Sequence, residues 1–151
     1  MRYEKDFADF LKLLNKNKVK YCVIGAFAVG FHGYPRFTKD IDILVEPNLN
    51  NAKKIIKAIR EFGFTSSDLT EEDFIQENKI IQLGYEPIRI DILTSLEGFK
   101  FKEIWNHKVV GTYGKEKVFF IGWDELIKSK KRAKRPQDLI DLERLMKRRE
   151  K

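Results

Sequence analysis

Sulfur and imidazole ligands are scarce in this sequence, which has one cysteine and two histidines among its 151 residues. One cysteine cannot form a disulfide within the chain, and no C-x-x-C pair or H-E-x-x-H motif is present to bind zinc. Cys22 lies in an apolar stretch, so we expect it to be a small, reduced core residue of a cytoplasmic protein.

Long apolar runs are also missing. No stretch approaches the roughly 20 apolar residues that a membrane-spanning helix needs, and the first residues lack the pattern of a secretory signal peptide. We therefore expect no contact with a membrane. With 42% hydrophobic residues the chain can bury a core, and we expect a single domain over residues 1–151.

The common glycine-rich nucleotide motifs are absent too. Gly25 and Gly30 have the spacing of a P-loop, but Phe31 and His32 stand where that motif needs a lysine and a serine or threonine. No G-x-G-x-x-G run follows an expected strand, so a dinucleotide-binding fold also lacks support. We expect His32 to be a hydrogen-bonded residue at a helix end, with contact to a substrate as the less favoured alternative.

What the sequence does have is three aspartates inside apolar strand patterns. In residues 38–45, Asp40 and Asp42 alternate with apolar residues and share one face, although aspartate is depleted in strands. Residues 88–93 repeat the pattern around Asp91. If the two strands pair, the three carboxylates repel one another unless a cation neutralises them. The pattern predicts a site suited to Mg²⁺, and the alternative is an ordinary solvent-exposed sheet face.

A strand, a glycine turn and a short helix precede the acidic pair. Residues 21–24 are apolar, Gly25 breaks the run, and residues 26–32 are typical of a short buried helix. Such a turn presents free backbone N–H groups at the start of a helix, an arrangement that binds phosphate.

Together these segments resemble a known signature. Ile24-Gly25-Ala26, then Asp40-Ile41-Asp42-Ile43, then Ile90-Asp91-Ile92 are similar to the motif of the nucleotidyltransferase superfamily, which has the polymerase β-type fold. The run from His32 to Asp40 resembles the small branch that contains AbiEii-type toxins and minimal nucleotidyltransferases.

The resemblance implies an α/β (α+β) fold, with helices packed on a mixed β-sheet of about four to six strands. It also implies Mg²⁺-dependent transfer of a nucleotide from a nucleoside triphosphate, with two metal ions. The catalytic residues and metal ligands would be Asp40, Asp42 and Asp91. The nucleotide-binding residues would be Gly25, Ala26, Arg36, Thr38, Lys130 and Arg135.

Position 26 departs from the family pattern. The residue after the glycine is usually glycine or serine in the family, where a serine hydroxyl helps to hold the triphosphate. Ala26 offers only its backbone N–H, so a weakened or idle nucleotide site is one interpretation of this chain.

The remaining periodicity predicts the other elements. Short helices are expected at residues 71–76 and 99–105. Two longer helices carry apolar stripes. The stripe of the first is Phe7, Phe10, Leu11 and Leu14, and that of the second is Ile55, Ile56, Ile59 and Phe62. Asn48 or Asn50 caps the second helix, and Gly63 ends it. Two hairpins are expected, formed by residues 79–85 with 88–93 and by residues 109–113 with 117–121.

Positive charge is concentrated at the C-terminal end. Residues 128–151 hold eleven Lys and Arg against four Asp and Glu, which accounts for the net charge of +7. We expect a basic helix over residues 136–150. A K-x-x-A-x-R-x-x-D arrangement there resembles the closing helix of the family, at Lys130, Ala133, Arg135 and Asp138. These charges either lie in solvent or attract a polyanion such as RNA, and Lys130 and Arg135 either lie in solvent or reach the triphosphate.

Three functions follow from these observations and the resemblance. The first is an enzyme that transfers a nucleoside monophosphate to a hydroxyl of RNA, such as a tRNA end, or of a protein, as the toxin of a toxin–antitoxin pair. The second is a small-molecule nucleotidyltransferase of the antibiotic-modifying kind, which would need an added helical domain or a helical partner protein for its acceptor. The third is an idle module that binds nucleotide or a partner such as an antitoxin.

Overall fold

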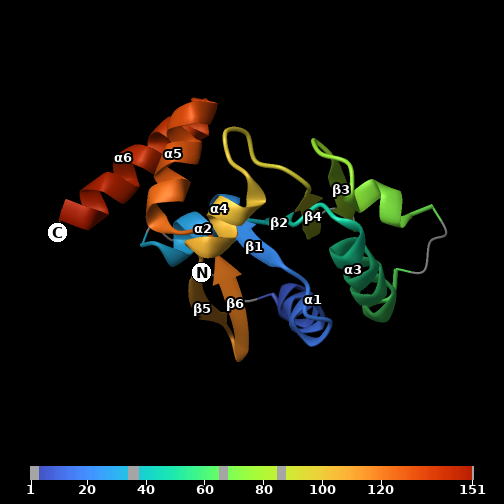
Figure 1. Cartoon of the computed structure of the whole chain (residues 1–151). Coiled ribbons are helices and arrows are strands. Elements are labelled where there is room, and N and C mark those ends of the chain that lie inside the picture. Colours follow the sequence, from blue (N-terminus) through green and yellow to red (C-terminus); the bar gives the residue numbers. More distant parts are fainter. Residues whose placement is uncertain (1–3, 34–37, 65–67, 85–87, 151) are drawn as a thin grey trace.

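The computed structural model describes residues 4–33, 38–64, 68–84 and 88–150. Figure 1 shows the order of the elements along the chain. They are α1 (Lys5–Lys16), β1 (Tyr21–Ile24), α2 (Gly25–Phe31), β2 (Asp40–Val45), α3 (Leu49–Phe62), the 3-10 helix η1 (Glu71–Phe74), β3 (Ile80–Leu83), β4 (Arg89–Leu93), α4 (Phe101–Asn106), β5 (Val109–Tyr113), β6 (Glu116–Phe120), α5 (Trp123–Ala133) and α6 (Pro136–Glu150).

Six strands form one mixed sheet in the order β3-β4-β2-β1-β6-β5. β2 runs parallel to β4 and β1 parallel to β6, while the other neighbours are antiparallel. The mixed sheet with packed helices that the resemblance implied is therefore confirmed. β2 alternates as expected, because Ile41, Ile43 and Val45 are fully buried on one face while Asp40 and Asp42 occupy the other.

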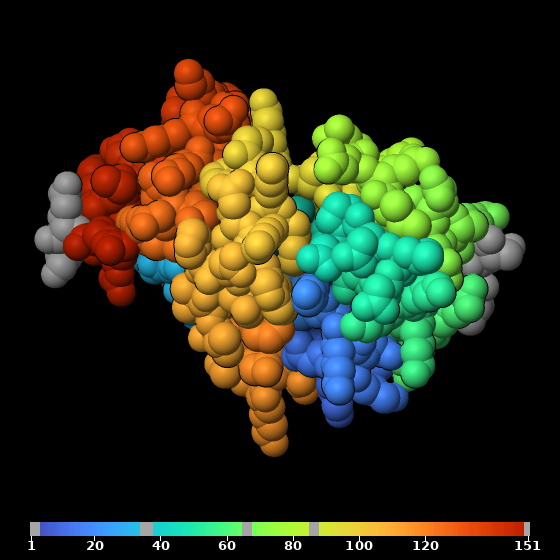
Figure 2. Space-filling view, in the orientation of Figure 1, coloured from blue at the N-terminus to red at the C-terminus, as the bar shows by residue number. Residues whose placement is uncertain are grey.

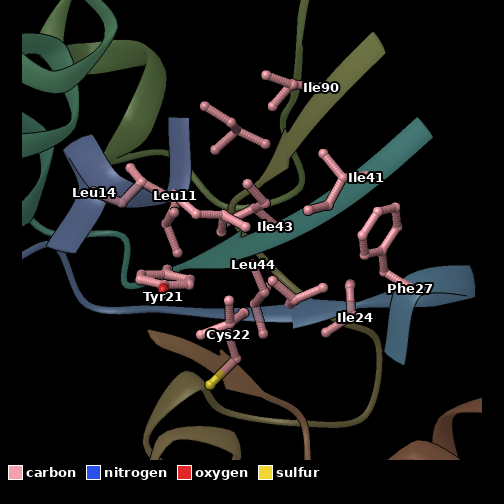
Figure 3. Close-up of a cluster of buried hydrophobic side chains, with 14 of the residues drawn as sticks. Leu11, Leu14, Tyr21, Cys22, Ile24, Phe27, Ile41, Ile43, Leu44 and Ile90 are labelled. Carbon is pink, nitrogen blue, oxygen red and sulfur yellow. The ribbon is translucent and has the colours of Figure 1, made fainter. Parts of the chain in front are cut away.

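The core lies between the sheet and the two long helices near the N-terminus. α1 packs on α3 and β6, and its buried residues are the four of the predicted apolar stripe together with Ala8. Figure 3 shows side chains of α1, β1, β2 and β4 in one cluster, with Leu11 and Leu14 near Tyr21 and Ile43. This packing holds β1 and β2 in the middle of the molecule, where both strands reach the site described below.

Local signals define α3 as the sequence predicted. The Asn48 side chain accepts a hydrogen bond from the backbone N–H of Asn51, and Gly63 ends the helix in the left-handed conformation with φ of 114°. The buried Asn51 amide also bonds the backbone of Lys20 and of Glu46. It thereby ties the start of β1 to the end of β2.

The C-terminal part differs from the prediction, because two helices stand where only the second was expected. α5 ends at Ala133, Lys134 adopts a left-handed conformation with φ of 56°, and α6 begins at Pro136. The sequence did carry a signal for α5, since Trp123, Leu126 and Ile127 have the i, i+3, i+4 spacing of one helix face. Figure 1 shows α5 and α6 beside the sheet, away from α1 and α3.

The other elements match their predicted positions to within a few residues. The predicted turn at Glu86-Pro87 lies outside the described residues. In the described part of the chain, no helix combines the length and apolar character needed to cross a membrane.

Candidate active site

Parallel pairing of β2 with β4 brings the aspartates together. Asp42 stands beside Asp91 in register, and Asp40 stands beside Arg89. Because side chains alternate along a strand, these four side chains project from one face of the sheet. The other face of both strands is apolar and buried. The condition set by the sequence, that the two acidic strands pair, is met.

Gly25 lies directly against this acidic group. Its φ is +70°, a conformation that other residues rarely adopt, and a side chain at this position would collide with Oδ2 of Asp42. β1 delivers Gly25 to this place because Ile24, the last residue of the strand, pairs with Asp42. Glycine is therefore required for two reasons, the positive φ of the backbone and the lack of space for a Cβ atom beside Asp42.

Asp42 carries a charge that its surroundings do not neutralise. Burial, and then repulsion from Asp91 and Asp40, raise the pKa of Asp42 to about 6, although Arg89 and Lys130 act in the opposite direction. Oδ1 of Asp40 is also buried and has no hydrogen-bond partner among the described residues. Two carboxylates of this group are therefore short of positive partners.

Arg89 is the cation inside the group. Its guanidinium donates to Oδ2 of Asp40 at 3.0 Å and to both oxygens of Asp91, at 3.0 and 3.2 Å. Arg89 was not among the site residues predicted from the sequence. A signal was present, since Arg89 precedes Asp91 by two positions and so had to share its face of the strand.

A cavity of about 370 Å³ extends from the aspartates to α5 and α6. Its wall includes Gly25, Asp40, Asp42, Arg89, Asp91, Lys130, Arg135 and Asp138. The two basic residues predicted to reach a triphosphate thus lie at the same cavity as the three aspartates, although they are far away in sequence.

Lys130 and Arg135 are held there by acidic residues of α6. The buried Lys130 ammonium lies 3.1 Å from Oδ1 of Asp138 and 3.0 Å from Oδ2 of Asp141. Arg135 donates to Oδ2 of Asp138 at 2.7 Å. Burial alone would raise the pKa of Asp138, but hydrogen bonds from Arg135 and Lys130 outweigh it and lower that pKa below its ordinary value.

Two solved structures resemble the chain over nearly its whole length. One is a lincosamide antibiotic adenylyltransferase, LnuA, bound to lincomycin, with 20% sequence identity, a TM-score of 0.65, and coverage of 95% of this chain and 96% of that one. The other is a protein of Thermotoga maritima provisionally described as a nucleotidyltransferase, with 16% identity, a TM-score of 0.65, and coverage of 95% and 91%. The chain has the nucleotidyltransferase fold.

At these levels of identity the likeness shows the fold alone. No protein-family model matches the sequence, and no curated protein matches it. The roles of the site residues in this chain therefore have to be inferred from their own geometry.

Of the remaining predicted site residues, the structure describes Thr38 and Ala26. Thr38 precedes β2, and its hydroxyl bonds the backbone of Asp40, so it braces the strand entrance. Ala26 follows Gly25 in α2 and is half-buried. Arg36 lies outside the described residues. His32 is hydrogen-bonded as expected, because its Nε2 lies 2.7 Å from the carbonyl oxygen of Ile121.

The acidic group fits Mg²⁺ in the kind of its ligands. Mg²⁺ prefers carboxylate oxygens, and the unpartnered Oδ1 of Asp40 and the under-neutralised Asp42 supply them. In the described part of the chain, however, no three carboxylate, imidazole or thiolate side chains are arranged to hold one metal ion. Arg89 competes with a cation for this group, because its guanidinium bonds Oδ2 of Asp40 and both oxygens of Asp91.

The edge strand β3 adds residues to the site that were predicted only as part of a hairpin. Gln82 stands in register with Asp91, so it continues the row that starts at Asp42. Ile80, 63% exposed, stands beside Leu93 in the next row, and both line the cavity together with Leu96. An apolar shelf therefore borders the carboxylates.

Proposed function

We propose that this protein is a Mg²⁺-dependent nucleotidyltransferase, which moves a nucleoside monophosphate from a nucleoside triphosphate to an acceptor hydroxyl. The acceptor oxygen forms a bond to the α phosphorus, the bond from that phosphorus to the leaving pyrophosphate breaks, and the hydroxyl proton is released. The single observation that carries the proposal is the register of Asp42 with Asp91, which sets the two carboxylates beside Gly25 at one cavity.

The three aspartates would hold the metal. Asp40, Asp42 and Asp91 are the ligands in the proposal, and Arg89 would give up part of its contact with Asp40 and Asp91 when the site is loaded. Two Mg²⁺ ions held there would neutralise the triphosphate and lower the pKa of the acceptor hydroxyl. No protein nucleophile is needed, because charge neutralisation and alignment lower the barrier to this transfer.

Basic residues on the opposite wall complete the nucleotide site. Lys130 and Arg135 are proposed to face the β and γ phosphates across the cavity, with Asp138 and Asp141 holding the Lys130 ammonium in place. The backbone at Gly25 and Ala26 would approach the phosphates beside Asp42, since Gly25 lines the cavity. Arg36 and Thr38 stay in the proposal as further nucleotide-binding residues.

The favoured acceptor is a hydroxyl of RNA, with a protein hydroxyl next. An RNA acceptor is favoured by electrostatics, since the whole net charge of +7 lies in residues 128–151, of which Lys130 and Arg135 line the cavity. Membership of the AbiEii-type branch, a role as a toxin and an antitoxin partner belong to the same proposal and rest on the sequence resemblance.

A small-molecule acceptor is the second candidate. Such an enzyme was expected to need an added helical domain, but LnuA, a lincosamide antibiotic adenylyltransferase, is matched over 96% of its length by 95% of this chain. Lack of room is therefore no argument against this candidate. The apolar shelf of Ile80, Leu93 and Leu96 beside the carboxylates would suit an apolar part of such an acceptor.

The test offers the full chain every acceptor class. The protein is incubated with Mg²⁺, each common nucleoside triphosphate labelled at the α phosphorus, and total RNA, a protein extract or small hydroxyl compounds. Label should move to one acceptor class. Asp91→Asn should reduce the transfer by about 100-fold or more, because several kcal/mol of charge stabilisation is lost.

A matched control is Asp124→Asn, which removes an exposed aspartate outside the cavity and should leave the transfer unchanged. Binding of triphosphate without any transfer, in the wild-type protein and with every acceptor class, would contradict the proposal and favour the idle module. Label on a small molecule alone would replace the RNA acceptor by the second candidate.

A further inference from the structure

A second basic surface lies away from the carboxylates. Trp105 of α4 and Phe119 of β6 pack edge to face, with ring centroids 5.3 Å apart, and both are half-buried. The two rings form part of a surface hollow of about 380 Å³. Its other lining residues are Asn15, Lys18, Val19, Lys20, Lys54 and Lys117. We call this surface the lysine–aromatic hollow.

Five lysines surround the two rings. The Lys108 ammonium lies 3.8 Å from the centre of the Trp105 ring and 5.3 Å from that of Phe119. The Lys20 ammonium lies 5.9 Å from the centre of the Trp105 ring, and the Lys117 ammonium lies 5.1 Å from that of Phe119. With Lys18 and Lys54 they make a cluster in which no ammonium is within 4.0 Å of a carboxylate of the described residues.

Four separate segments build the hollow, which is why no local sequence pattern revealed it. Figure 2 shows these segments meeting on one face, in blue for the residues around 20, teal for those around 54, and gold to orange for residues 105–119. The loop before β1, helix α3, helix α4 and strand β6 each contribute at least one lysine or aromatic ring.

This combination matches the chemistry of single-stranded nucleic acid. Unpaired bases stack on aromatic rings, while the phosphates between them lie against lysines. An anionic membrane or an acidic peptide would use the lysines but would not need the rings. We propose that the lysine–aromatic hollow binds single-stranded nucleic acid, with bases on Trp105 and Phe119 and phosphates on the lysines.

Lys108 covers one face of the Trp105 ring. This half-buried lysine also donates a hydrogen bond, 3.3 Å long, to the carbonyl oxygen of Trp105. In the proposal a base takes the place of the ammonium on the ring, and the ammonium then contacts a phosphate.

The hollow is separate from the proposed transfer site. Lys20 precedes β1 and Gly25 follows it, so the two sites lie at opposite ends of this strand, roughly 15 Å apart along its axis. Nucleic-acid binding at the hollow requires neither triphosphate nor Mg²⁺. It can be measured without both, and its failure would leave the proposed nucleotidyl transfer untouched.

The test uses the fluorescence of Trp105 in the full chain. The chain has two tryptophans, and Trp123→Phe leaves Trp105 as the one that remains. Oligouridylate is then titrated into this variant in the presence of a chelator. Stacking of a base should quench this fluorescence. Lys18→Gln, Lys20→Gln and Lys117→Gln together should weaken binding by about tenfold or more and reduce the salt slope by about 2, since each lost phosphate contact removes about 0.7.

The matched control removes the same charge from exposed positions on α1 and α3, by Lys12→Gln, Lys57→Gln and Arg60→Gln. Its effect on affinity should be less than threefold. Trp105→Phe should keep binding, whereas Trp105→Leu should lose about tenfold, provided that both variants unfold at the wild-type urea concentration. Oligothymidylate in a parallel titration tells whether RNA or DNA is preferred.

Several outcomes would overturn the proposal. One is binding of oligouridylate without quenching of the Trp105 fluorescence. Another is an equal loss of affinity in the two triple variants. The proposal would also be overturned if the triple lysine variant no longer bound anionic phospholipid vesicles but still bound oligouridylate as the wild type does. This surface would then bind membranes. The triple lysine variant alters only exposed side chains, so it decides the matter even if the Trp105 variants fail to fold.

Discussion

Two groups of buried charges face the same cavity and solve the same electrostatic problem differently. On α5 and α6, the Lys130 ammonium lies between Asp138 and Asp141, and the pKa of Asp138 is lowered. On β2 and β4, Asp42 lies beside Asp91 and its pKa is raised to about 6, because burial and neighbouring carboxylates outweigh the nearby cations. One group is neutralised by the chain itself, and the other is short of positive charge.

The difference separates structure from ligand binding. A buried ion pair whose partners are all present joins two elements, and here it fixes α6 against α5. A buried carboxylate without sufficient positive charge costs stability, and it is expected at a site that an external cation completes. The contrast predicts opposite effects when each group is altered.

The largest effect is expected in the neutralised group. Lys130→Met should lower the free energy of unfolding by about 3–5 kcal/mol, because Asp138 and Asp141 would keep their charges in a buried place without the ammonium. Urea denaturation measures this. Lys131→Met, at an exposed neighbouring position, is the control and should change the stability by about 0.5 kcal/mol or less. A small loss for both variants would show that Arg135 alone neutralises the pair.

The next effect concerns Asp42 and pH, with metal removed by a chelator. Its folded pKa of about 6 exceeds the ordinary value of 3.8. The stability it contributes is therefore complete below about pH 4 and is lost as the pH rises through 6, a change of about 2–3 kcal/mol. Asp138 has the opposite sign, since its lowered pKa adds stability that disappears as the pH falls.

Asp42→Asn isolates this contribution. The variant should be as stable as the wild type or more stable at pH 7, and the part of its stability that depends on pH between 4 and 7 should be smaller. It should also lose divalent-ion-dependent binding of triphosphate. Urea denaturation at a series of pH values checks the first two results. Marked unfolding at pH 7 would instead make Asp42 a structural residue.

A smaller effect is expected at Ala26, next to Gly25. If the only missing contact is the hydroxyl of the family's serine, Ala26→Ser should tighten triphosphate binding by roughly 1.5–3 kcal/mol at most, the value of one hydrogen bond to a charged group. Isothermal titration with a non-hydrolysable triphosphate measures it. Unchanged or weaker binding would show that the loop does not hold phosphate through this position.

The smallest effect is expected from the exposed cations of α6. Arg144→Gln with Lys147→Gln should weaken binding of an RNA acceptor by a few-fold and reduce the salt slope by about 1.4, if both contact phosphate. Substitutions are preferable to truncation because Leu145 is fully buried. Titration with bulk tRNA at two salt concentrations measures the change. An unaltered salt slope would show that these charges only form a solvated helix face.

Local chemistry made part of the site predictable. Alternation in residues 38–45 and 88–93 set the acidic face of each strand, because the side-chain period of a strand is two. The same rule would have found Arg89, which was overlooked. The helices α1 and α3 were predictable from their apolar spacing, and the end of α3 from Gly63, since these signals depend on neighbours along the chain.

What only the tertiary structure decided are the contacts between distant segments. The parallel register placed Asp42 beside Asp91, and the packing of α5 and α6 brought Lys130 to the same cavity and surrounded it with carboxylates. Four segments likewise had to meet to form the lysine–aromatic hollow. Charge neutralisation depends on distances in space, which a linear pattern does not contain. The sequence by itself therefore determined which residues carry charge, and the fold decided which of those charges are compensated.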